Sequence, residues 1–227
     1  DGYIVTNNHV IEDATSIQIR TSDGEIYPAE LVGRDAETDL AVLKVDATGL
    51  PTATFADSDY LEVGDLVIAV GNPLGTLGGT VTDGIISALN REIEIEGQKM
   101  TLIQTSAAVN QGNSGGGLFD ANGDLVGIVN AKSSGSGIEG LGFAIPANLA
   151  KDVVAQIMDV GYVTGRPQLG IVVVEIFDLA AANHYGVKEY GVYINDVTRD
   201  NGLMIGDRFL SIDGQEIESF EDIKAIL

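Results

Sequence analysis

The segment Gly112–Gly117, with the sequence GNSGGG, surrounds a single serine with glycines. A serine hydroxyl is a weak nucleophile, which needs a neighbouring base and hydrogen-bond donors for the oxyanion that develops. Glycines permit a tight turn and let backbone N–H groups point at one spot without interference from Cβ atoms. Ser114 is therefore a candidate nucleophile, although a polar glycine loop without chemistry is the commoner fate of such a string.

Two histidines could supply the base. His9 follows the apolar segment Tyr3–Thr6 directly, whereas His184 lies much later in the chain, where a helix end on the surface is the expected setting. A lone histidine is more often structural than catalytic. His9 is the stronger candidate because it belongs to the same strand-rich part of the chain as Ser114.

An acid that orients this base should be buried beside it, where it holds the imidazole tautomer through Nδ1–H. Asp39 stands immediately before the apolar run Leu40–Val45. An acid in that place either caps a turn or serves a buried partner. Because the chain has 34 acidic residues, position alone leaves this choice open.

The elements that must hold these residues are predicted to be mainly strands. Glycine accounts for 29 of the 227 residues, above the usual share of about 7%, which indicates many tight turns. Apolar runs at Leu40–Val45, Leu66–Val70 and Leu125–Val129 predict buried strands, and turn signals at Ser22–Glu25 and Asp120–Asp124 predict hairpins. Strands that recur without helices up to about residue 145 are typical of a barrel or a sandwich.

A helix is predicted after Pro146, since Leu149, Val153 and Ile157 recur every four residues and would form one apolar stripe. Gly161 is the expected end of this helix. These residues complete a first domain, which we place at residues 1–163.

A linker is predicted at Thr164–Pro167, and a smaller αβ domain follows it at residues 167–227. In this domain Asp178 is positioned to cap a short helix, and Ser219–Asp222 fits the capping box of a last one.

Composition excludes several classes of function. The formal net charge of −22 argues against nucleic-acid partners, because phosphate backbones require clustered Lys and Arg. The absence of cysteine excludes thiol catalysis, disulfides and thiolate metal sites. No Walker-type loop is present, so the chain cannot use ATP to unfold a partner. We expect neither a metal nor an organic cofactor.

Taken in chain order, His9, Asp39 and Ser114 resemble the catalytic residues of trypsin-like peptidases, and more narrowly those of the HtrA (DegP-like) family. The three motifs that carry the resemblance and the three stretches that support it are Thr6–Ile11, Thr38–Lys44, Gly112–Gly116, Gly71–Gly75, Thr80–Ala88 and Gly140–Pro146. The resemblance covers essentially the whole chain.

The resemblance implies a mainly β fold, in which a chymotrypsin-like double β-barrel protease domain is followed by a partial αβ PDZ domain. Ser114 would attack the peptide carbonyl, His9 would act as base and then acid, and Asp39 would orient the imidazole. The N–H groups of Gly112 and Ser114 would form the oxyanion hole. The specificity pocket would involve Ala108, six residues before the nucleophile, with Val109 beside it.

Lys132 lies on the strand expected to form the other wall of that pocket. Its ammonium either meets an acidic group there or extends into solvent and takes no part. In the second domain, Leu169-Gly170-Ile171 matches the loop of PDZ domains that receives a peptide C-terminus on backbone N–H groups. A simple strand start is the alternative for this loop when it is considered without the family.

Several departures from the family pattern predict that the chain is a fragment. The segment Val197–Gly206 is shorter than usual, and the strands expected after Leu227 are absent. The N-terminal part of the first barrel is also expected to be missing. We therefore expect a protease domain that lacks its N-terminal part and a PDZ domain that is shortened and C-terminally truncated.

The implied function is that of an ATP-independent serine endopeptidase that degrades unfolded or misfolded proteins. A dormant protease that serves as a chaperone or peptide-binding scaffold in quality control is the alternative. The implied partners are unfolded polypeptides and peptide C-termini. The implied location is extracytoplasmic, in the bacterial periplasm or at the cell-envelope surface. The full-length parent is expected to be a homotrimer or higher multiple, either tethered to the membrane or free.

Overall fold

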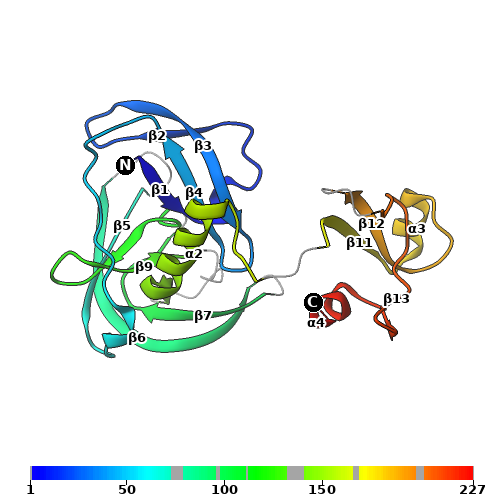
Figure 1. Cartoon of the computed structure of the whole chain (residues 1–227). Coiled ribbons are helices and arrows are strands. Elements are labelled where there is room, and N and C mark those ends of the chain that lie inside the picture. Colours follow the sequence, from blue (N-terminus) through cyan, green and yellow to red (C-terminus); the bar gives the residue numbers. More distant parts are fainter. Residues whose placement is uncertain are drawn as a thin grey trace. The chain divides into compact units, whose positions relative to one another are not determined.

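The computed structural model describes residues 2–72, 79–95, 98–110, 112–131, 141–165, 169–197 and 202–226 (Figure 1). The chain divides into two compact units, Asp1–Thr164 and Gly165–Leu227. Among the described residues, no helix is both long and apolar enough to cross a membrane.

The first sheet of the first unit has four antiparallel strands in the order β1-β4-β3-β2. These strands are β1 (Tyr3–Thr6), β2 (Ile17–Arg20), β3 (Ile26–Asp35) and β4 (Leu40–Val45). All residues of β4 are buried except Lys44, which is half-buried, so the predicted buried strand is confirmed. This four-stranded sheet is open among the described residues, whereas closure into a barrel needs enough strands to surround a core of side chains.

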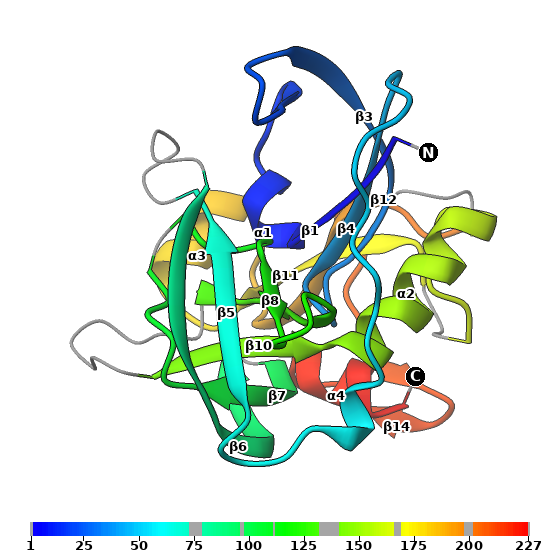
Figure 2. The same ribbon diagram turned by 90° about the vertical axis from the view of Figure 1, so that its left-hand side faces the viewer.

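The second sheet closes into a barrel of six strands in the order β10-β7-β6-β5-β8-β9. The strands are β5 (Leu66–Gly71), β6 (Thr80–Ile95), β7 (Gln98–Thr105), β8 (Gly117–Phe119), β9 (Leu125–Val129) and β10 (Gly142–Pro146). Figure 2 shows β5 and β6 side by side, and α1 (Asn8–Ile11) close to the end of β1. Val67, Ile86 and Leu118 fill the barrel, each completely buried.

Helix α2 (Ala147–Val160) packs along β3 and β4 and on β9 (Figure 1). It begins after Pro146 and ends where Gly161, at φ 87°, donates its N–H to the carbonyl of Ile157, as the sequence predicted. The predicted apolar stripe was wrong at Leu149, which is 38% exposed. Spacings of three and four residues define the buried face instead, and its members are Ala147, Ala150, Val153, Val154 and Ile157.

The second unit contains strands β11 (Ile171–Ile176), β12 (Gly191–Val197), β13 (Ser211–Ile212) and β14 (Gln215–Glu216), with helices α3 (Leu179–Tyr185) and α4 (Phe220–Ile226). Strands β11 and β12 pair antiparallel, as do β13 and β14. Both predicted caps are confirmed. Asp178 accepts the N–H of Ala181 at 2.7 Å, and Asp222 accepts the N–H of Ser219 at 2.7 Å.

Candidate active site

The pairing of β1 with β4 brings His9 beside Asp39. Thr6 pairs with Ala41 at the end of this ladder, so the residues that follow β1 meet those that precede β4. The carbonyl of Asp39 accepts the backbone N–H of Asn8 at 3.1 Å and the side-chain amide of Asn7 at 2.9 Å. These bonds hold the start of α1 against the residue that precedes β4, at the point where the two side chains meet.

Asp39 has a φ of 56°, in the left-handed region that a residue other than glycine adopts rarely. Such a conformation costs on the order of 1–3 kcal/mol and persists only where the surroundings hold it. Here its carboxylate Oδ1 accepts the backbone N–H of His9 at 2.9 Å, in addition to the bonds on its carbonyl. The strain aims the second carboxylate oxygen at the imidazole.

His9 connects the acid to the serine. Its Nδ1 lies 2.6 Å from Oδ2 of Asp39, and its Nε2 lies 3.0 Å from Oγ of Ser114. The side chains of His9 and Asp39 are only 18% and 9% exposed. A carboxylate that accepts Nδ1–H leaves a lone pair on Nε2 facing the serine hydroxyl, which can then lose its proton to the ring.

The glycines after Ser114 let the serine loop approach both sheets of the first unit. A Cβ atom on Gly115, at φ 79°, would lie 2.3 Å from Oγ1 of Thr6 in β1. A Cβ atom on Gly116 would lie 2.2 Å from the carbonyl oxygen of Val70 in β5. The serine loop therefore lies against an open-sheet strand on one side and a barrel strand on the other, which brings Ser114 to His9.

The backbone N–H groups of Gly112 and Ser114 find no acceptor within the described part of the chain. Ser114 Oγ itself accepts the N–H of Ala131 at 3.3 Å. Two N–H donors beside Ser114 that have no acceptor among the described residues are what an oxyanion would need. Among the described residues there is no cluster of three or more His, Asp or Glu that could hold a metal ion.

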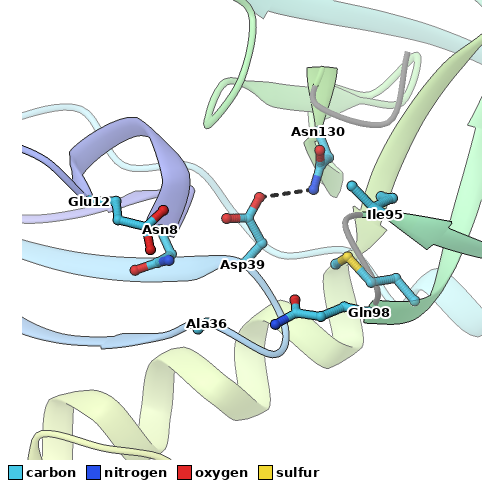
Figure 3. Close-up of a pocket in the computed structure, with 8 residues that line it drawn as sticks. Asn8, Glu12, Ala36, Asp39, Ile95, Gln98 and Asn130 are labelled. Carbon is cyan, nitrogen blue, oxygen red and sulfur yellow. Dashed lines mark hydrogen bonds between the residues drawn. The ribbon is translucent and has the colours of Figure 1, made fainter. Parts of the chain in front are cut away.

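Asn130 is a site residue that the sequence reasoning missed. Its side-chain amide donates to Oδ2 of Asp39 at 3.0 Å (Figure 3), and the residue is 1% exposed. Asn130 is 91 positions from Asp39 in sequence, so no local motif connects the two. The one available signal was an amide placed directly after the fully buried strand Leu125–Val129.

We predict that Asn130→Ala lowers kcat about 10- to 100-fold with little change in KM, because hydrogen bonds to charged groups contribute about 1.5–3 kcal/mol. The loss arises from a carboxylate that is held less firmly against the imidazole. Peptide hydrolysis should be compared with that of Asn122→Ala, which removes an exposed amide from a hairpin turn. An unchanged kcat in a folded Asn130→Ala protein would contradict the positioning role.

Two of the residues expected at the specificity pocket are described. Ala108 is exposed, and its carbonyl accepts from Thr82 Oγ1 at 2.9 Å and from the amide of Asn113 at 3.3 Å. Val109 is 8% exposed and lies against Gly142, where an added Cβ would come within 2.7 Å of its methyl group. Lys132 lies outside the described residues.

The expected peptide-binding loop lies at the start of β11 in the second unit. Gly170 has a φ of 68°, and Leu169 packs against the buried cluster of Val192, Ile217 and Ile223. Ile171 is half-buried as the first residue of the strand. The leucine therefore anchors the start of β11 to the core of the second unit.

Comparisons with known proteins show the family to which this chain is similar. The trypsin-like peptidase domain family matches residues 1–128. The probable periplasmic serine endoprotease DegP-like of Chlamydia trachomatis is 43% identical over 234 residues, which cover 99% of this chain and 46% of that protein. The periplasmic serine endoprotease DegP of Escherichia coli is 40% identical over 232 residues, which cover 99% of this chain and 48% of that protein.

Among solved structures, the HtrA-type protease AlgW with a decapeptide superposes with a TM-score of 0.67 at 43% identity. That match covers 99% of this chain and 70% of the AlgW chain. The present chain thus spans about half the length of the curated relatives it matches. With this similarity along nearly its whole length, the chain belongs to the HtrA (DegP-like) family of trypsin-like serine proteases.

Proposed function

We propose that the chain is the catalytic part of an ATP-independent serine endopeptidase that degrades unfolded or misfolded proteins outside the cytoplasm. The observation that carries the proposal is the continuous set of hydrogen bonds from Asp39 through His9 to Ser114. The names of the relatives, which include periplasmic serine endoproteases, support the reaction class and the location.

In the proposed mechanism, Ser114 Oγ attacks the scissile carbonyl while Nε2 of His9 takes the hydroxyl proton. Asp39 keeps the imidazole in the required tautomer and stabilises the imidazolium. The N–H groups of Gly112 and Ser114 receive the negative charge of the tetrahedral intermediate, an interaction that typically contributes about 10²- to 10³-fold in rate. His9 then returns the proton to the leaving amine, and water repeats the cycle on the acyl-enzyme.

The second unit is proposed to be a PDZ domain that recognises peptide C-termini. Backbone N–H groups at Leu169-Gly170-Ile171 would receive the terminal carboxylate, and the peptide would add as a strand beside β11. The relative AlgW was solved with a bound decapeptide, which supports peptide recognition within the family.

We place the two domains at residues 1–163 and 167–227. For the full-length parent we further propose a homotrimer or higher multiple, either anchored in the membrane or secreted.

An organophosphorus inhibitor that reacts with activated serines tests the proposal on the whole chain. Unfolded casein should be degraded, and the treated protein should carry one adduct, mapped to Ser114, and lose this activity. A protein that takes up no adduct and leaves casein intact, while it suppresses aggregation, would instead be the dormant protease acting as a chaperone. Degradation that continues with Ser114 fully labelled would exclude the proposed nucleophile.

We predict cleavage after small or medium aliphatic residues, not after Lys or Arg. The stretch Ser106–Asn113 holds no acid, so a basic head group in the pocket would lose water without gaining a counter-ion, at a cost of several kcal/mol. Val109, buried beside Ala108, would narrow the pocket with its branched side chain. Cut sites mapped by mass spectrometry in unfolded proteins provide the measurement. A majority after Lys or Arg would contradict the prediction, and enrichment after Asp or Glu would assign the selectivity to Lys132.

A further inference from the structure

The segment between β7 and β8 carries both the expected floor of the specificity pocket and the proposed oxyanion donors. From residue 106 to residue 116, its described residues belong to no helix or strand. Gly112 is exposed and has a φ of 98°, so no regular structure fixes the direction of its N–H group. The mechanism proposed above depends on that direction, because oxyanion donors must be aimed before the reaction starts.

Asn113, which lies between Gly112 and the nucleophile, connects the two ends of this segment. Its side-chain amide donates to the carbonyl of Ala108 at 3.3 Å, and its backbone N–H donates to the carbonyl of Asn110 at 3.0 Å. The residue is 2% exposed, and its Oδ1 is buried with no donor among the described residues. The amide nitrogen is therefore the polar atom of this side chain that the structure uses.

The carbonyl of Ala108 has a second donor in β6. Oγ1 of Thr82 donates to it at 2.9 Å, so a barrel strand and the residue before the nucleophile hold the same oxygen. An amide turned the other way would set its own oxygen against this carbonyl, where no hydrogen bond can form. Position 113 thus requires a donor, and a carboxylate there would meet the carbonyl with a negative oxygen.

The end of β5 packs against the other side of Asn113. A Cβ atom on Gly71 would lie 2.3 Å from Oδ1 of Asn113 and 2.9 Å from its Cα. The next residue of the chain, Asn72, donates its backbone N–H to the carbonyl of Gly112 at 3.1 Å. The side chain of Asn113 is therefore enclosed between β5 and the segment that it holds.

We propose that Asn113 is a positioning residue of the catalytic site, whose hydrogen bond to Ala108 holds the oxyanion donors in place. Thr82 has the same role from β6, since it holds the same carbonyl. The inference rests on the proposed peptidase function, because its effect is exerted on the oxyanion of that reaction. Among the described residues neither side chain has a hydrogen bond to His9 or Ser114, so both affect the rate through the segment that they anchor.

Asn113→Asp tests the proposal on the whole chain, because it changes the NH₂ donor to an oxygen with almost no change in shape. At about pH 8 the carboxylate cannot donate to Ala108, and kcat for peptide hydrolysis should fall about 10²- to 10³-fold, as for the loss of an oxyanion donor. KM should change less than about threefold, since the oxyanion is bound only in the transition state. Asn122→Asp, which adds the same charge to an exposed hairpin turn, should keep the parental kcat.

The pH dependence of Asn113→Asp distinguishes a lost hydrogen bond from a general loss of packing. A protonated carboxyl has an O–H that can donate to Ala108 as the amide does. Gly71 and Ala108 lie against this side chain and carry no charge, so burial should raise the pKa of the new carboxyl above its ordinary value. Protonation as the pH falls restores the donor, and the ratio of variant to parental kcat should rise about tenfold or more from about pH 8 to about pH 5.5. The ratio cancels the protonation of His9, which affects both proteins alike.

Substitutions at Thr82 test the same carbonyl without changing the residues around the nucleophile. Thr82→Val keeps the shape but removes the hydroxyl, and it should lower kcat about two- to tenfold, as expected for one neutral hydrogen bond. Thr82→Ser retains the donor and should recover most of the parental rate. This pair also decides the proposal if Asn113→Asp does not fold.

Amide hydrogen exchange separates this inference from the proposed function, since it needs no cleavage. In Asn113→Asp at about pH 8, peptides from residues 106–114 should exchange about tenfold faster than in the parent, while those of β9 keep their protection. A parent that cleaves no peptide would refute the proposed function and leave the exchange result to decide whether Asn113 orders the segment. Unchanged exchange overturns the inference. So does a folded Asn113→Asp protein with kcat within about threefold of the parent, a loss that does not shrink at low pH, or equal activity of Thr82→Val and Thr82→Ser.

Discussion

Replacing Ser114 with alanine is expected to lower kcat about 10⁶-fold, and replacing His9 with alanine should cost about as much, because nucleophile and base act as one unit. The hydrogen bond of 3.0 Å between His9 Nε2 and Ser114 Oγ is the physical basis of this coupling. A base without its nucleophile has no proton to take, and a nucleophile without its base stays a neutral hydroxyl. The double variant should therefore be no slower than either single one.

The second histidine provides the control for this prediction. His184 is in the last turn of α3, in the second unit, with its ring edge-on to Tyr185. His184→Ala removes the same kind of side chain from a helix on the surface. This variant should leave kcat unchanged in the same peptide assay. If His184→Ala abolishes hydrolysis and His9→Ala does not, the assignment of the base is wrong.

The residues of the candidate site that the sequence predicted all lie in local motifs. His9, Asp39 and Ser114 each have a neighbourhood that demands a special backbone, and the structure brings their side chains within hydrogen-bond distance. Asn130 could not be found in this way, because its function depends on where the end of β9 arrives in space.

The fold was predictable to a similar extent. Strand-forming runs and helix caps are local features of the sequence. The strand at Leu125–Val129 and the ends of α2 at Pro146 and Gly161 are therefore found where the sequence predicts them. Closure of a sheet depends on strand number and stagger, which no local pattern encodes. Leu149 illustrates the same limit within one helix, since its exposure depends on which face meets β4 rather than on its own hydrophobicity.

The hydrogen bonds around Asp39 determine what an amide in its place would do. Its Oδ1 receives the backbone N–H of His9, and its Oδ2 receives both Asn130 and the imidazole Nδ1. An asparagine has one acceptor and one donor at these two positions. If its oxygen accepts the backbone N–H, its NH₂ group faces the imidazole Nδ1, which must then be unprotonated. The proton of a neutral ring is then on Nε2, where it points at Ser114 and blocks its role as base.

We therefore predict that Asp39→Asn lowers kcat about 10⁴-fold, the cost expected when the imidazole is held in the wrong tautomer. The fold should be retained, because asparagine is among the residues that best tolerate the left-handed conformation at φ 56°. Asp39→Ala is the informative companion, since it removes the same charge but adds backbone strain, and it should unfold at a lower temperature than Asp39→Asn. Thermal unfolding and peptide hydrolysis, measured on the same samples, separate the two effects. A folded Asp39→Asn protein with kcat within tenfold of the parent would show that the carboxylate does not orient the base.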